Sequence, residues 1–180
     1  YSGQRLVDSE LNFIENHNLN KYRSLKSRFV LSDFAGCTGV FNKALLNEVI
    51  KFKPNYMLMH DTWILRVCLC LGGSVIVDTE PRMNYRQHAN NTIGLKRGFR
   101  STLKQVKLYL NEYKIEKLTK ELVRGYGNRM VPEYRELCDW ICKYRENSKY
   151  KNNLLNKSNI NYCNKGLNLT FWLKVRMNKL

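Results

Sequence analysis

The clearest hydrophobic pattern in the chain lies in residues 61–71, which are apolar on nearly every side of a predicted helix. A helix of that kind is expected to be buried. A glycine pair ends it, and the apolar run of residues 74–78 predicts a buried strand. Pro81 then allows only an edge position or a turn, and residues 83–86 are expected to be extended. This alternation of helix and strand predicts an α/β layer.

The residues before this helix predict shorter elements. Gly36 and Gly39 allow a close approach of the backbone, Asn42 is a suitable helix N-cap, and Pro54 stops the helix that follows. The expected elements are a strand at residues 5–7, an exposed loop at 15–28, a short strand at 39–41 and a helix over 43–52.

The pattern changes after Gly94 and becomes helical in period. The expected elements are a helix over residues 98–124, a break at 125–127, a helix beginning at Pro132 and ending at residue 144, a loose segment over 145–166 and a short amphipathic helix over 167–180. The chain is therefore expected to divide into an α/β part, residues 1–95, and a helical extension, residues 96–180.

Charge separates the same two parts. The formal net charge is +16, to which residues 1–95 contribute +3 (11 Lys and Arg, 8 Asp and Glu) and residues 96–180 contribute +13 (20 and 7). A basic surface suits nucleic acid, an anionic membrane or a phosphorylated substrate. Nucleic-acid binding is the rival function, but the lysines are dispersed and no helix-turn-helix, zinc-finger or RNA-binding signature occurs, so no nucleic acid is favoured as a partner.

Other sequence features narrow the class further. No run approaches about 18 apolar residues, so no membrane span is expected, and the first residues do not resemble a signal peptide. The spacings of Cys68 with Cys70 and of Cys138 with Cys142 differ from the C-x-x-C of zinc sites. Reduced thiols and a cytoplasmic location are therefore expected.

The last helix combines apolar and basic residues. Within residues 167–180, apolar residues are interleaved with basic ones. The apolar residues are Phe171, Trp172, Leu173, Val175 and Met177, and the basic ones are Lys174, Arg176 and Lys179. This composition suits a helix lying on an anionic lipid surface, which would make the protein peripheral on the inner face of the plasma membrane. The alternative is that the helix packs on the rest of the domain.

Three sequence blocks carry a resemblance to a known family. They are Gly36-Cys37-Thr38-Gly39-Val40-Phe41-Asn42-Lys43, His60-Asp61-Thr62-Trp63 and Tyr85-Arg86-Gln87-His88-Ala89-Asn90-Asn91-Thr92-Ile93-Gly94. In this order they resemble the second half of family 2 glycosyltransferases, and in particular bacterial rhamnosyltransferase-like enzymes of surface-polysaccharide assembly. The resemblance covers about residues 1–95. It implies the second half of a nucleotide-sugar transferase (GT-A-like) sheet domain followed by a basic helical extension.

The resemblance implies a catalytic role for Asp61. In that family the acid of the His-Asp block is the general base, which takes the proton of an acceptor hydroxyl as it attacks the anomeric carbon with inversion. A carboxylate at a helix start suits this role, because the helix N-terminus favours negative charge. The alternative is that Asp61 merely caps the helix.

The resemblance also implies roles for residues around this acid. His88 is expected to approach the divalent metal, Mn²⁺ or Mg²⁺, or the diphosphate leaving group. The remaining candidates are assigned to substrate binding: Arg86 offsetting the charge of the leaving group, Gln87 with no more specific role, His60 orienting the base, Trp63 lining the acceptor sugar, and Gly36, Cys37 and Thr38 forming the acceptor wall. For His88 and Arg86 the alternative is pairing with nearby groups; for His60 it is a place in the loop, and for Trp63 a place in the core.

One departure from the family pattern changes the expected activity. The family's nucleotide and metal site depends on an upstream Asp-x-Asp motif, and Asp8 and Asp33 are the isolated candidates here. The chain is therefore expected to be a fragment, one product of a split gene or a remnant, and to have little transferase activity alone. The complete enzyme is expected to use a nucleotide-sugar donor and a saccharide or lipid-linked acceptor, with a missing N-terminal half as partner.

Overall fold

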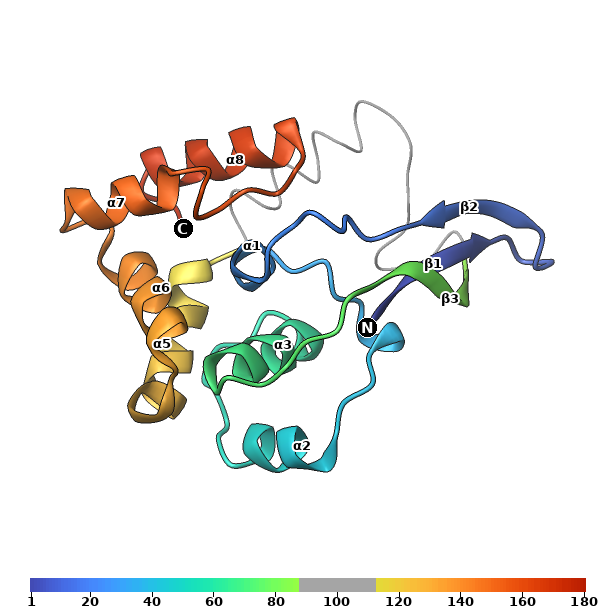
Figure 1. The fold of residues 1–180 in the computed structure, drawn as a ribbon, viewed down its shortest axis with the longest axis horizontal. Helices are drawn as coiled ribbons and strands as arrows, with labels where there is room; N and C mark the ends of the chain where they lie inside the picture. Colours follow the sequence, from blue (N-terminus) through green and yellow to red (C-terminus); the bar gives the residue numbers. More distant parts are fainter. Residues whose placement is uncertain (88–112) are drawn as a thin grey trace.

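A computed structural model describes residues 1–87 and 113–180. Figure 1 shows a small sheet on one side of helix α3, helices α5 and α6 on the other side, and α8 lying across the top. Within the described residues the strands are β1 (Ser2–Val7), β2 (Phe13–His17) and β3 (Asp78–Arg86). The α-helices are α1 (Leu25–Val30), α2 (Lys43–Ile50), α3 (His60–Cys70), α5 (Ile115–Tyr126), α6 (Pro132–Lys143), α7 (Ser148–Leu155) and α8 (Lys165–Arg176). The predicted mixed α/β class is confirmed.

The sheet has the strand order β2-β1-β3. β1 pairs with β2 in antiparallel fashion and with β3 in parallel, with Leu6 opposite Tyr85. In this sheet β3 is an edge strand, which explains how it accommodates Pro81, a residue that cannot donate to a ladder. The strand predicted at residues 74–78 is wrong, because β3 begins only at Asp78, and Ile76 before it is 81% exposed.

Helix α3 lies at the centre of the molecule and is buried as predicted. Arg66 on this helix is 2% exposed. Its guanidinium donates to the carbonyl oxygens of Phe29 (2.7 Å) and Val30 (3.1 Å) at the end of α1, and to that of Thr62 (3.1 Å). Carbonyls at a helix end need such donors, so Arg66 ties α1 to α3. Gly72 ends α3 with a φ of +75°, in agreement with the predicted glycine stop.

One hydrophobic core includes residues from both predicted parts of the chain. Phe29, Trp63 and Val67 belong to the first part, and Leu122 and Leu137 to the second. The predicted boundary at residue 95 lies outside the described residues, as do residues 98–112 of the helix predicted over 98–124. That prediction of one continuous helix is wrong in the described part, because residues 113 and 114 are not helical and α5 begins at Ile115. The division into two parts stays a prediction.

Three further loop or strand predictions are wrong. The segment predicted as an exposed loop over 15–28 contains the end of β2 and most of α1. Residues 39–41 form no strand, and the short 3-10 helix η1 (Gly36–Thr38) precedes them. The segment predicted as loose over 145–166 contains α7, whose Leu154 is buried. In the first and third cases tertiary packing stabilises an element with too few residues to show a clear periodicity.

The predictions that rest on local signals are confirmed. The side chain of Asn42 caps α2 by accepting a hydrogen bond from the backbone N–H of Leu45 at 2.9 Å. Pro132 is the first residue of α6. The break predicted at residues 125–127 comes later than expected, because α5 continues through Gly125 and Tyr126 before the 3-10 turn η2 (Gly127–Arg129). The predicted C-terminal helix is α8, which begins two residues earlier than expected.

Candidate functional site

Asp61 lies in the first turn of α3 and joins this helix to η1. One of its carboxylate oxygens accepts a hydrogen bond from the backbone N–H of Thr62 at 2.6 Å, and the other accepts from the N–H of Gly36 at 3.0 Å. The hydroxyl of Thr62 donates to the carbonyl of Met59, which steadies the same turn. The side chain of Asp61 is buried, at 5% exposure for the residue. Asp61 therefore links α3 to η1, and its carboxylate lies at a helix N-terminus, which favours negative charge.

Gly36 approaches Asp61 so closely that a side chain has little room there. A Cβ atom at Gly36 would lie 3.1 Å from the Cβ of Asp61 and 3.2 Å from the imidazole Nε2 of His60. The close backbone approach predicted for this glycine is present in the structure. His60 itself is exposed. The structure thus brings Gly36 next to the consecutive residues His60 and Asp61, although Gly36 lies 25 positions before Asp61 in the chain.

The two residues after Gly36 face different surroundings. Cys37 is exposed, and its sulfur accepts a hydrogen bond from the side-chain amide of Gln4 at 3.3 Å. The hydroxyl of Thr38 donates to the carbonyl of Ala35 at 2.8 Å and stabilises the 3-10 turn. Both residues lie within one turn of the amide that contacts Asp61.

The other predicted site residues lie elsewhere or outside the described part. Arg86 ends β3 opposite Val7, and the backbone N–H of Gln87 donates to the carbonyl of Val7 at 2.7 Å. Trp63 is 2% exposed and packs against Phe52 and Tyr126, with ring centroids 6.2 Å away in both cases. It occupies the core in this structure and presents no face to a sugar.

The predicted metal ligand cannot be placed, since His88 lies outside the described residues. Among residues 1–87 and 113–180, no group of three or more His, Cys, Asp or Glu side chains could hold a metal ion. Both oxygens of Asp61 already accept backbone hydrogen bonds. The described residues therefore do not fit a complete Mn²⁺ or Mg²⁺ site.

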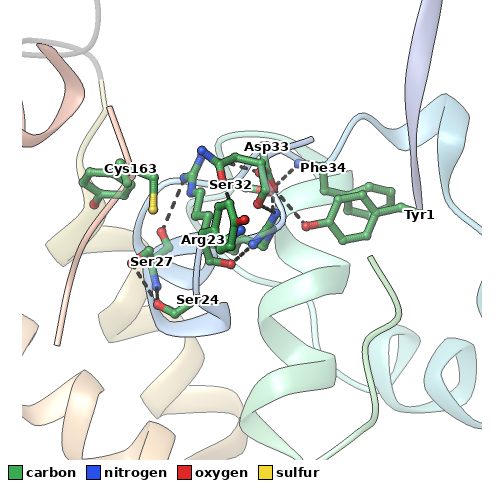
Figure 2. Close-up of polar contacts among 12 residues, drawn as sticks. Tyr1, Arg23, Ser24, Ser27, Ser32, Asp33, Phe34 and Cys163 are labelled. Carbon is green, nitrogen blue, oxygen red and sulfur yellow. Dashed lines mark hydrogen bonds and ion pairs between the residues drawn. The ribbon is translucent and has the colours of Figure 1, made fainter. Parts of the chain in front are cut away.

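A second polar cluster, which the sequence reasoning missed, surrounds Asp33 (Figure 2). Its carboxylate accepts hydrogen bonds from the Nε of Arg28 (3.1 Å) and the hydroxyl of Tyr1 (2.9 Å), and it pairs with Arg23 at 3.5 Å. Arg28 also donates to the backbone carbonyl of Arg23. Both guanidinium groups are buried, with 7% and 2% of the side chains of Arg23 and Arg28 exposed. The sequence signal was two arginines followed by a lone acid in a polar segment.

The Asp33 cluster connects parts of the chain that are distant in sequence. The guanidinium of Arg23 lies 4.9 Å from the ring centroid of Tyr162. The hydroxyl of Ser27 accepts from the backbone N–H of Asn161 at 2.9 Å. Burial, and then the charge of Asp33, raise the pKa of Tyr1 above its ordinary range. These contacts describe a structural junction between β1, α1 and the segment before α8.

A cavity of about 450 Å³ lies beside α2 and α3. Its lining is mainly apolar and includes Phe34, Val40, Leu45, Ile64 and Val75. Asp61 is not among the lining residues, so the candidate base does not open into this cavity.

Comparison with known proteins indicates a relationship to glycosyltransferases. The chain is similar to the dTDP-rhamnosyl transferase RfbG of Shigella flexneri, with 32% identity over 91 residues. The match covers 47% of this chain and only about a third (32%) of that protein. No family model matches the chain, and no solved structure matches it. The similarity supports a glycosyltransferase relationship at the general level.

Proposed function

We propose that the chain is the acceptor-side part of a glycosyltransferase in which Asp61 is the general base. The observation that carries the proposal is the grouping of Asp61, Gly36 and His60 at the start of α3, in a chain that is similar to a rhamnosyl transferase. The order of the Gly36 and His60-Asp61 blocks, as in family 2 glycosyltransferases, supports it. The GT-A-like sheet identity is part of the same proposal.

In the proposed reaction, Asp61 takes the proton of an acceptor hydroxyl as the hydroxyl oxygen attacks the anomeric carbon of the donor sugar. The bond between that carbon and the diphosphate oxygen breaks, and its electron pair leaves with the nucleoside diphosphate. The configuration at the anomeric carbon is thereby inverted. A positioned base contributes roughly 10²–10⁴-fold to such a step.

Because Asp61 is buried, the acceptor must replace one of its present donors. We assign this exchange to the Gly36 N–H, whose segment covers the carboxylate, while the Thr62 N–H keeps the other oxygen in place. The exposed His60 lies at the edge of this cover and positions the acceptor. Cys37 and Thr38 form the adjoining wall.

The donor side of the reaction is proposed to require residues beyond those described. We propose a nucleotide-sugar donor, with dTDP-rhamnose the first to test because of the name of the similar protein. A saccharide or lipid-linked saccharide is the proposed acceptor. His88 as a metal ligand, and Arg86 and Gln87 beside the leaving group, remain part of the proposal.

The test is sugar transfer from a panel of dTDP-, UDP- and GDP-sugars to saccharide and lipid-linked acceptors. It is run on this chain and on the longest polypeptide that its reading frame encodes. Asp61→Asn is expected to lower kcat about 100-fold or more with a smaller change in KM, because the substitution removes the base. His60→Ala is expected to raise KM instead.

Asp78→Asn is the matched control, because Asp78 is paired with the exposed Arg82 at 2.6 Å on β3. Its transfer rate should equal that of the unmodified protein. Circular dichroism of Asp61→Asn separates loss of the base from loss of the fold. A folded Asp61→Asn protein with an unchanged kcat would contradict the proposed role of Asp61.

A further inference from the structure

The last 34 residues of the chain carry only positive side-chain charge. No Asp or Glu occurs after Glu146. The basic residues of this segment are Lys149, Lys151, Lys157, Lys165, Lys174, Arg176 and Lys179. Lys174 is buried and donates to the backbone carbonyl of Tyr113, and Lys151 donates to the side chain of Asn178. The other five are exposed.

Helix α8 has one face in the core and a second apolar face outside it. The inner face packs through Thr170, Phe171, Lys174 and Val175, which are buried. The outer face holds four apolar side chains at helical spacing, exposed as follows: Leu169 59%, Trp172 41%, Leu173 38% and Met177 51%. Helix α8 therefore packs on the rest of the domain, which is one of the two alternatives predicted from the sequence, and the other, a helix lying on anionic lipid, stays a prediction.

Basic residues occupy the same outer face. Lys165 lies four residues before Leu169, and Arg176 lies four residues after Trp172. Residues four apart share one face of a helix, so both basic residues lie on the outer face. The guanidinium of Arg176 lies 4.9 Å from the ring centroid of Trp172. An apolar stripe interleaved with cations is the composition of helices that lie in the interface of an anionic membrane.

A groove between α7 and α8 continues this face inward. It has a volume of about 390 Å³, and its apolar lining includes Leu154 of α7 and Phe171 of α8, both buried. Lys157 and Lys165 also line it and are exposed. Within the part of the chain that the structure describes, neither ammonium group has an acidic partner. An apolar channel bordered by two cations matches an acyl chain attached to an anionic headgroup.

We propose that the outer face of α8 and the groove between α7 and α8 bind anionic phospholipid at a membrane surface. The four exposed apolar side chains enter the interface, an acyl chain occupies the groove, and the headgroup phosphate is held between Lys157 and Lys165. Nucleic acid fits the charge but not the apolar stripe, since phosphate contacts would leave that stripe in water. Among the described residues no helix is both long and apolar enough to cross a bilayer.

The test is flotation of the full chain with vesicles of phosphatidylcholine alone or mixed with phosphatidylglycerol. Binding is expected only with phosphatidylglycerol and should weaken as salt is raised. Leu169→Gln/Trp172→Gln is expected to abolish flotation. Lys157→Gln/Lys165→Gln should weaken it about 25-fold, since each lysine near an anionic surface contributes about fivefold.

Two exposed pairs elsewhere provide matched controls. Leu46→Gln/Ile50→Gln changes an apolar pair on α2, at 42% and 69% exposure, and should leave flotation unchanged. Lys21→Gln/Lys43→Gln removes two exposed positive charges outside the proposed lipid site and should also leave flotation unchanged. Because all eight side chains are exposed, the variants should fold, which circular dichroism checks.

Insertion of the outer face of α8 is read from phospholipids brominated on the acyl chain. These should quench the emission of Trp172, whereas Trp63 and Trp140 are buried at 2% and 5% exposure and should not be quenched. Quenching is therefore expected to disappear in Trp172→Gln.

Three results would overturn the lipid proposal. They are equal flotation with both vesicle types, flotation that survives Leu169→Gln/Trp172→Gln, and tighter retention of RNA or DNA that depends on the lysines but not on the apolar pair. The last result would assign this face to nucleic acid. None of these results bears on Asp61, which lies on α3 and takes no part in the proposed lipid site. The lipid proposal and the proposed function can therefore each be refuted without the other.

Discussion

Replacing Asp33 with Asn removes the one negative charge between two buried guanidinium groups. Arg28 and Arg23 lie 3.1 and 3.5 Å from its carboxylate oxygens, and Tyr1 donates a third contact. An Asn side chain keeps one acceptor oxygen but turns an N–H₂ donor toward the second guanidinium. The substitution therefore leaves buried positive charge without compensation.

The size of the effect follows from this burial. Removing one partner of a buried ion pair costs about 3–5 kcal/mol. The side chain of Asp33 is 15% exposed, so water offsets part of the loss, and we expect a loss near the lower end, about 3 kcal/mol. That is a large share of the roughly 5–15 kcal/mol that stabilises a typical domain.

The assay is urea unfolding at neutral pH, followed by circular dichroism. Asp78→Asn is the control, because Asp78 and Arg82 are 36% and 65% exposed and such a pair contributes about 0–1 kcal/mol. In the Asp33→Asn background, Arg23→Met should recover part of the loss by removing an uncompensated charge. If Asp33→Asn shifts the urea midpoint no more than Asp78→Asn does, the cluster around Asp33 does not hold the fold as argued.

Two further predictions concern single residues. Burial lowers the pKa of Lys174 from 10.5 to about 8, so between these values the unfolded chain binds the proton more strongly, and the free energy of unfolding should rise with pH across that interval. Lys174→Met should remove this rise, and parallel pH profiles of the two proteins would refute it. Gly72→Ala should destabilise by about 1–2 kcal/mol in urea unfolding, because its φ is +75° and the new Cβ would lie 2.8 Å from Val131. Gly166→Ala, in α8 with no contact closer than 3.4 Å, should be neutral or stabilising, and equal effects at the two glycines would contradict the argument.

The elements that could be located from the sequence are those with local determinants. Helix α3 has an apolar surface and a glycine at its end, α2 has the side chain of Asn42 as its cap, and α6 begins with Pro132. Each of these signals acts within one or two helical turns. No distant residue is needed to interpret it.

The elements that were missed depend on distant partners. Helix α1 has only six residues, and the carbonyls of Phe29 and Val30 at its end accept hydrogen bonds from Arg66 of α3, 37 and 36 residues further along the chain. Strand β3 was predicted only in part, as extended residues 83–86 and an edge position for Pro81, and its polar first half forms because β1 pairs with it on one side. No periodicity in either segment predicts these partners.

The candidate site was found only in part for the same reason. The family resemblance picked out Gly36 and Asp61, and the structure shows the hydrogen bond that joins them. It could not indicate that Trp63 is enclosed by Phe52 and Tyr126, because that packing involves the C-terminal helices.

The middle position of β1 determines how the sheet can come apart. In the part of the chain that the structure describes, β2 and β3 each pair with β1 and not with one another. Release of the middle strand would expose both hydrogen-bonded ladders in one event, whereas fraying of an outer strand exposes only its own. Amide protons in the ladder of an outer strand that frays should therefore exchange faster than those exposed only by release of β1.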